Sequence, residues 1–152
     1  MTSNIEIANR NKVEVPGFIL ERTAKRMKQY FQRSLTAANT GITIDQWVVL
    51  QQLHLKDGLN QLDIARATYK DAPTITRIID LLCNKKLTRR TPDENDRRRF
   101  KILLTAAGKE KIAEVLPIIK QARSDAWDGL SDEQISQLEN TLNVVFLNLE
   151  KQ

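Results

Sequence analysis

A short stretch in the middle of the chain concentrates positive charge. Between Lys85 and Lys101 there are three acidic residues and eight basic ones, namely Lys85, Lys86, Arg89, Arg90, Arg97, Arg98, Arg99 and Lys101. The net charge of this stretch, +5, equals the formal charge of the whole 152-residue chain. Such focused charge is typical of a surface that binds a polyanion. Charged residues on an edge strand also prevent aggregation, so composition alone leaves both interpretations open.

The residues before this cluster predict a helix with one apolar and one polar face. Counted from Ala72, four aliphatic residues at three- and four-residue spacing share one side: Ile75, Ile78, Ile79 and Leu82. The opposite side carries Pro73, Thr76, Arg77 and Asp80. Small, hydroxylated and cationic side chains near a helix start suit a helix that enters the major groove of DNA.

Two runs after this helix predict a β-hairpin with a long, basic tip. The runs are Leu87–Thr91 and Phe100–Leu104, and the turn formers Pro92, Asp93 and Asn95 lie between them. A second short helix is predicted just upstream, over Asn60–Thr68. Two short helices joined by a tight turn and followed by a basic hairpin form the outline of a winged helix-turn-helix.

Length and composition limit the class of protein. A chain of 152 residues with 41% hydrophobic and 28% charged residues is expected to form a single soluble domain over 1–152. We expect no signal peptide and no membrane association, and the cytoplasm is the default location. One cysteine and one histidine make a metal site very unfavourable. No phosphate loop or nucleophile–base motif is present, so we expect no enzyme, no catalytic residues and no cofactor.

Capping signals place the other helices. Thr43, Asn60 and Ser131 each precede a helical pattern and have Gln or Asp three residues later, as in a capping box. The expected helices span 18–40, 43–55, 105–127 and 131–150, in addition to the two short ones. Gly41 is expected to end the helix over 18–40. In the helix over 60–68, the expected core residues are Leu62, Ile64 and Ala65. Residues 1–15 are interpreted as a polar arm.

The terminal helices carry more apolar surface than a small reading domain needs to cover. The last helix has a long stripe: Ile135, Leu138, Leu142, Val145, Phe146 and Leu149. We expect 1–40 and 105–152 to pack together as a helical dimerisation region, and 43–104 to form the DNA-binding region. A two-fold homodimer would present two reading helices to the half-sites of a palindrome. An intramolecular bundle is the alternative.

The segment from Thr43 to Thr105 resembles the MarR family of bacterial transcriptional regulators. The matching residues are Leu59 to Ala65, then Thr74, Thr76, Arg77, Asp80 and Leu82, then Leu87, Arg89 and Arg90, then Asp96-Arg97-Arg98, and finally Leu104-Thr105-x-x-Gly108. The resemblance implies a mostly α fold with a small β-hairpin wing, in which a winged helix-turn-helix core is flanked by N- and C-terminal dimerisation helices. It also implies a homodimer that binds a pseudo-palindromic operator in double-stranded DNA.

The resemblance assigns roles to individual residues. The helix after the turn would enter the major groove and the wing the minor groove, with Asp96 orienting the wing arginines and Arg98 inserted in the groove. The expected DNA-binding residues are Pro73, Thr74, Thr76, Arg77, Arg89, Arg97, Arg98 and Arg99. Arg77 could read a guanine edge or contact the backbone. Asp80 is expected to pair with a cation, because phosphates repel a carboxylate.

Lys86 departs from the family pattern, and Cys83 raises the question of a redox role. The family usually has glycine where this chain has Lys86, before the first wing strand. A non-glycine residue in left-handed conformation there costs about 1 kcal/mol, unless the helix ends differently. Peroxide-sensing relatives have a cysteine in the first helix, where this chain has none. Cys83 is expected to be a packed small residue and not a redox switch.

Many relatives release DNA when a small aromatic or phenolic acid binds between the reading and dimer regions. The residues that could line such a pocket here are Met27, Tyr30, Phe31, Trp47 and His54. Each also has a structural interpretation, as a stripe, staple or helix-end residue. The expected function is a DNA-binding transcriptional regulator, a repressor by preference, released by such an effector. The alternative is a winged-helix protein–protein interaction module that does not read DNA.

Overall fold

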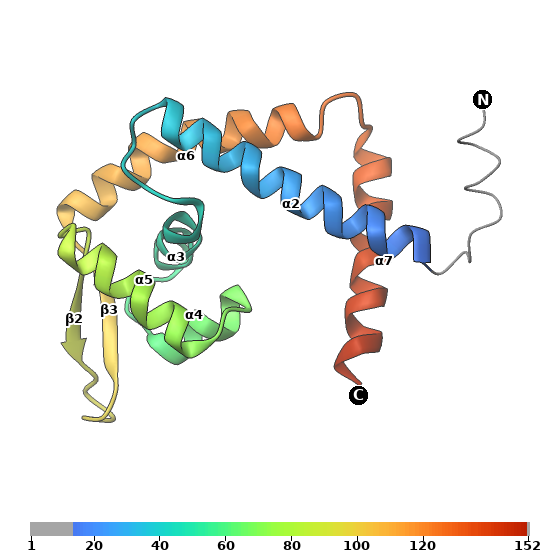
Figure 1. Cartoon of the computed structure of the whole chain (residues 1–152). Helices are drawn as coiled ribbons and strands as arrows, with labels where there is room; N and C mark the ends of the chain where they lie inside the picture. Colours follow the sequence, from blue (N-terminus) through green and yellow to red (C-terminus); the bar gives the residue numbers. More distant parts are fainter. Residues whose placement is uncertain (1–13, 152) are drawn as a thin grey trace, which may run out of the picture. The chain divides into compact units, whose positions relative to one another are not determined.

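The computed structural model describes residues 14–151, and most of them are helical (Figure 1). The elements are α2 (Glu14–Ala37), α3 (Ile44–Leu55), β1 (Leu59–Asn60), α4 (Gln61–Thr68), α5 (Ala72–Asn84), β2 (Thr88–Pro92), β3 (Phe100–Leu104), α6 (Ala106–Ala126) and α7 (Asp132–Glu150). The predicted fold class, mostly α with a small β wing, is confirmed.

The chain forms two compact units, one reaching to Ala122 and the other from Arg123 onward. The first unit holds the helix-turn-helix and the wing, and the second holds the end of α6 and all of α7. The prediction of a single domain with DNA-binding and dimerisation regions stays a prediction.

The first helix, α2, differs from the prediction at both ends. It begins at Glu14, so Pro16 and Gly17 lie in its first turns, whereas most of the predicted arm lies outside the described residues. Proline is tolerated there because the first helical N–H groups have no intrahelical acceptor. The helix ends at Ala37, and the first left-handed residue after it is Asn39, with φ of 53°, so Asn39 and not Gly41 is the residue that ends the helix. The Thr40 N–H donates to the Leu35 carbonyl 3.3 Å away, which closes a Schellman motif.

The predicted N-caps are confirmed. Thr43 and Ser131 each form a full capping box with the glutamine three residues later. Asn60 caps α4 through a 2.8 Å bond from the Asp63 N–H, but no reciprocal bond closes a box. Asp63 is too short for that bond, since the motif uses Glu or Gln. Each cap stabilises its helix by about 1 kcal/mol.

The core lies where α3, α4, α5, β3 and α6 meet. Its largest fully buried side chains include Trp47, Leu50, Ile79 and Ile102. The predicted apolar face of α5 is buried throughout. Of the three core residues predicted in α4, Ile64 and Ala65 are buried, whereas the prediction for Leu62 is wrong because Leu62 is 40% exposed. Helix α4 has only eight residues, about two turns, and so few of its side chains face the core. Leu62 falls on the outer side.

The wing belongs to a three-stranded antiparallel sheet in the order β1-β3-β2. Strand β3 pairs with β2 from Thr88↔Leu104 to Pro92↔Phe100, and with β1 at Leu59↔Ile102 and Asn60↔Lys101. The two hairpin strands agree with the prediction to within one residue, whereas β1 was not predicted. Strands β2 and β3 extend away from the helices, and the loop between them forms the tip (Figure 1).

A close backbone approach fixes the base of the wing. A Cβ atom on Gly108, in the first turn of α6, would lie 2.1 Å from the Leu87 carbonyl oxygen. Thr105 caps α6 through a 3.0 Å bond from the Gly108 N–H, and its hydroxyl donates to the Lys86 carbonyl. Lys86 adopts φ of 60°, so this lysine takes the left-handed conformation for which the family uses glycine.

We predict that Gly108→Ala lowers the free energy of unfolding by about 1–3 kcal/mol, because backbone atoms must move to admit the methyl group. Gly17→Ala is the matched control, since nothing lies within 4 Å of its Cβ position and alanine favours the helix. Urea titrations measure both. Equal stability of the Gly108 variant and the parent chain would contradict the close approach.

Candidate nucleic-acid interface

Helix α5 presents a small polar face at its start. The Asp71 carboxylate accepts a 2.8 Å hydrogen bond from the Thr74 N–H and caps the helix, and Pro73 occupies the first turn. Hydrogen bonding to Thr74 lowers the pKa of Asp71, so the carboxylate stays ionised. Its negative charge then interacts favourably with the positive N-terminal end of the helix dipole. Burial of the opposite face leaves Pro73, Thr76 and Arg77 exposed, while Thr74 is half-buried.

The wing tip carries three consecutive exposed arginines, Arg97, Arg98 and Arg99. Asp96 turns the chain in front of them: its carboxylate accepts a 3.0 Å bond from the Arg98 N–H and lies 3.5 Å from the Arg99 Nε. A 2.9 Å bond from the Asp93 N–H to the Arg99 carbonyl closes the base of this loop. Asp96 therefore contacts the arginines it was predicted to orient. Its role in binding DNA stays a prediction.

The strand alternation separates two arginines of β2. Arg90 pairs across the sheet with the buried Ile102 and lies on the inner face, whereas Arg89 pairs with Leu103 and is exposed on the other face. The Arg90 guanidinium forms an ion pair with Asp80 of α5 and donates a 3.3 Å bond to the Gln61 side chain. Asp80 therefore pairs with a cation, in agreement with the sequence argument. Arg90 ties the wing to the reading helix.

Lys85 also points inward from the basic cluster. Its ammonium donates to the Gly41 carbonyl and, over 2.8 Å, to the Gln46 side chain. Burial and the nearby charge of Lys111 lower the pKa of Lys85. Lys85 and Arg90 of the cluster thus contact distant segments of the protein itself. Sequence charge could not reveal this, because the acceptors lie 39 and 44 residues away.

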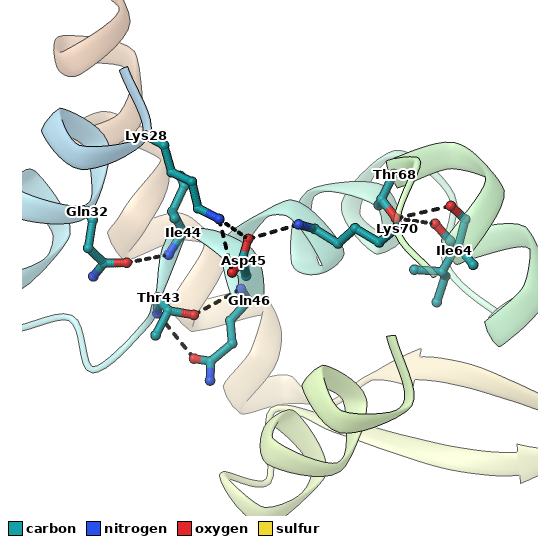
Figure 2. A network of polar contacts seen from close by, with 10 residues as sticks. Lys28, Gln32, Thr43, Ile44, Asp45, Gln46, Ile64, Thr68 and Lys70 are labelled. Atoms are coloured by element: carbon teal, nitrogen blue, oxygen red, sulfur yellow. Dashed lines mark hydrogen bonds and ion pairs between the residues drawn. The ribbon is translucent and has the colours of Figure 1, made fainter. Parts of the chain in front are cut away.

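Asp45 joins three parts of the first unit (Figure 2). Its carboxylate lies 3.1 Å from the Lys28 ammonium of α2 and 2.9 Å from that of Lys70, in the turn before α5. Burial disfavours the charged carboxylate, but the hydrogen bonds from Lys70 and Lys28 outweigh burial and lower the pKa of Asp45. The carboxylate therefore links the long first helix to the turn that starts the reading helix. Sequence reasoning missed this residue, because only the fold brings the two lysines together.

Two hollows lie near these networks. One of about 600 Å³, which we call the α2–α3 hollow, is lined by Lys25, Lys28, Gln29, Gln32, Arg33, Thr43, Ile44 and Asp45. Another of about 260 Å³ lies between the wing and the start of α4, where it is lined by Arg98, Arg99 and Phe100 and by Asn60, Gln61 and Leu62. The first is lined by three cationic side chains and one carboxylate, that of Asp45, and the second by two arginines, so the net positive charge of both suits anionic groups.

The predicted effector residues have different environments. Met27 and Phe31 are half-buried, Tyr30 and His54 are exposed, and Trp47 is buried. None of the five lines either hollow. The buried indole N–H of Trp47 has no hydrogen-bond partner among the described residues, an arrangement that costs about 1–3 kcal/mol. Their role in ligand binding stays a prediction.

Cys83 is half-buried at the end of α5, with its sulfur 3.3 Å from the Thr88 hydroxyl. Among residues 14–151, no three His, Cys, Asp or Glu side chains gather as a metal ion would require. Within the same range, no helix is long and apolar enough to cross a membrane.

Known proteins similar to this chain have the same winged-helix architecture. The sequence model of the MarR family matches residues 42–100, which run from the start of α3 to the end of the wing tip. The predicted resemblance to the MarR family is confirmed. The winged helix of this chain is therefore similar to that of the MarR family, with α4 and α5 as its helix-turn-helix and β2 and β3 as its wing.

Solved structures extend the MarR-type likeness beyond the matched segment. The Staphylococcus aureus MepR–DNA complex is 28% identical, with 87% of this chain and 96% of that chain covered and a TM-score of 0.79. Bordetella bronchiseptica BpsR, whose DNA binding is regulated by 6-hydroxynicotinic acid, is 26% identical, with 87% and 98% covered and a TM-score of 0.78. A MarR transcriptional regulator from Methanosarcina mazei Go1 is 25% identical, with 91% and 98% covered and a TM-score of 0.78.

We predict that Asp45→Asn lowers the free energy of unfolding by up to about 1 kcal/mol near neutral pH, since a partly exposed ion pair is screened by solvent. Because folding lowers the Asp45 pKa, its contribution is complete above the ordinary carboxyl value of 3.8 and is lost as the pH falls through the folded pKa. Urea unfolding at several pH values should show the difference between the two proteins shrinking in acid.

Asp132→Asn is the control for the Asp45 variant. Asp132 also lies in the first turn of a helix, so this variant isolates the helix-dipole contribution. A difference for Asp45→Asn that persists undiminished at pH 2 would show that the lysine pairs are not its source.

Proposed function

We propose that this chain is a transcriptional regulator that binds a pseudo-palindromic operator as a homodimer and is released by a small-molecule effector. The observation that carries the proposal is the tie between wing and reading helix. Arg90 joins β2 to Asp80 of α5, while Arg97, Arg98 and Arg99 stay exposed at the tip. A protein-interaction module would have no use for three exposed arginines held at a fixed offset from a polar helix start.

In this proposal the two elements occupy neighbouring grooves of the duplex. Helix α5 enters the major groove, where Thr76 and Arg77 meet base edges or phosphates. Arg98 enters the minor groove, where a narrow groove concentrates negative potential around a guanidinium. Pro73, Thr74, Arg89, Arg97 and Arg99 complete the proposed DNA-contacting set, and Asp96 orients the tip.

The homodimer is supported by apolar surface that the chain leaves in water. Phe18, Ile19 and Leu20 of α2 are 43–63% exposed, and within the described chain no residue of α7 is buried. Burying such surface stabilises an interface by roughly 25 cal/mol for each Å². A second copy of the chain would cover both helices and present two α5 helices about a two-fold axis, as a palindrome requires.

The effector is proposed to be a small aromatic or phenolic acid. BpsR, a structural relative, responds to 6-hydroxynicotinic acid. In this chain the α2–α3 hollow offers Lys25, Lys28 and Arg33 to a carboxylate. Its position beside the Asp45 network favours release of DNA on binding, and hence a repressor. Met27, Tyr30, Phe31, Trp47 and His54 do not line this hollow, and they remain proposed effector contacts at a separate site.

We predict that Arg98→Ala weakens operator binding by about 1–3 kcal/mol with an unchanged unfolding curve. The operator is first found by protection mapping on the DNA upstream of the chain's own gene. Affinity of the parent chain should fall steeply as salt rises, because bound phosphates release counterions. Arg26→Ala, an exposed arginine on α2, is the control. Equal affinities for parent and Arg98 variant would remove the wing from the mechanism, and a flat salt response would favour a protein partner.

We predict that Leu138→Asp converts a dimer into a monomer, because a carboxylate would have to be desolvated in the apolar interface. Operator affinity should fall with it, since one subunit reaches only one half-site. Ser136→Asp places the same charge on the exposed side of α7, away from the stripe, and should leave the dimer intact. Sedimentation measures the oligomeric state. A parent chain that sediments as a monomer at micromolar concentration would contradict the proposed assembly.

A further inference from the structure

A chain of polar contacts connects strand β2 of the wing with an exposed position near the start of α5. Asp80 pairs with the Arg90 guanidinium, and the Arg90 Nε donates a 3.3 Å bond to the Gln61 Oε1. The Gln61 Nε2 donates a 3.0 Å bond to the Thr76 hydroxyl oxygen. The Thr76 hydroxyl in turn donates a 3.0 Å bond to the Ala72 carbonyl. We call these four side chains the Thr76 relay.

The direction of every bond in the Thr76 relay is set by the arginine. A guanidinium only donates hydrogen bonds, so the amide atom of Gln61 that faces Arg90 must be its oxygen. The Gln61 nitrogen then faces Thr76 and donates, so the Thr76 oxygen must accept. The hydroxyl proton of Thr76 is left with the Ala72 carbonyl, one turn earlier in the same helix.

The relay leaves Thr76 with one kind of hydrogen-bonding capacity. A hydroxyl has one proton and two lone pairs. The proton is used by Ala72 and one lone pair by Gln61, so one lone pair remains, on an exposed residue. In the major groove, the groups that donate to such a lone pair are the amino groups of adenine and cytosine. Guanine and thymine offer only acceptors there, and a Thr76 in this state cannot donate to them.

We propose that Gln61 and Arg90 are positioning residues that fix Thr76 as an acceptor, so that Thr76 selects an adenine or cytosine amino group at one base pair of each half-site. This inference rests on the proposed function, because it assumes that α5 reads DNA. It gives Arg90 a role different from that of its basic neighbours. The Arg90 side chain is 28% exposed and paired with Asp80, so it acts through Gln61 and not as a phosphate contact.

The experiment measures relative affinity for every single base-pair substitution of one operator half-site. The parent chain should prefer one base pair by about three- to tenfold, the range expected for one hydrogen bond to a base. Thr76→Val removes the hydroxyl at nearly constant volume and should abolish the preference at that base pair alone. Thr141→Val is its matched control, because the Thr141 hydroxyl also donates to a carbonyl one turn earlier, 2.8 Å away, on α7.

The relay itself is tested by Gln61→Ala and Arg90→Lys. Without the Gln61 amide, the Thr76 hydroxyl can rotate and donate as well as accept, so the preference at the same base pair should flatten. Arg90→Lys keeps the charge but loses the planar guanidinium group, so it should also reduce the preference at that base pair. Combining Gln61→Ala with Thr76→Val should add nothing at that position. Replacing the preferred base by an analogue without the amino group should weaken the parent chain and leave Thr76→Val unaffected.

The outcomes separate the relay from the function on which it depends. A parent chain that binds no duplex would overturn the proposed function, and the relay with it. If the parent chain binds DNA, an unchanged preference in Gln61→Ala would overturn the relay alone. A loss of affinity that is uniform over all sequences would do the same, because it would indicate a structural role for Gln61. A salt slope that is smaller by about one in Arg90→Gln would identify Arg90 as a phosphate contact.

Discussion

The exclusion of one face of α5 from water determines what the opposite face can do. Ile75, Ile79 and Leu82 are fully buried, and burial of each stabilises the fold by roughly 1.5–3 kcal/mol. The helix cannot turn about its axis without losing that stabilisation. Its polar side is therefore held in a fixed direction before any polar contact forms. The geometry with which this MarR-like chain is proposed to meet DNA is, in this sense, a property of its apolar core.

The basic residues of the cluster fall into two groups, those that contact other parts of the protein and those that face solvent at the wing tip. Arg90 is partly buried and Lys85 is exposed, and each is matched by acceptors from distant segments. Removing Asp80 would leave the partly buried Arg90 guanidinium without its counter-ion. The contacts of Lys85 and Arg90 thus contribute to the internal alignment of the fold. Arg97, Arg98 and Arg99 remain in water at the wing tip, where they keep their full charge for a polyanion. A count of basic residues treats both kinds alike, whereas only the exposed guanidinium groups at the wing tip are placed to contact a polyanion directly.

Local signals allowed the sequence to predict most of the fold. The caps at Thr43, Asn60 and Ser131 act within one turn, so they located three helix starts correctly. Features that depend on residues far apart in the sequence were not predicted. Strand β1 has only two residues and no pattern of its own, and it exists because Ile102 and Lys101 pair with it. The Asp45 and Thr76 networks likewise join residues up to 29 positions apart, which no spacing rule predicts.

The weakness of the Asp45 contacts suits the role proposed for the neighbouring hollow. Lys28 from α2 and Lys70 from the turn before α5 share one carboxylate, and its side chain is 39% exposed. Partly exposed ion pairs stabilise by only about 0–1 kcal/mol, so a ligand carboxylate in the α2–α3 hollow could replace Asp45 beside Lys28 at little cost. Lys28 lines that hollow, so the exchange needs no large movement of α2. A fully buried pair would hold the two helices more firmly, but it would resist exchange, because separating it would leave an unpaired buried charge.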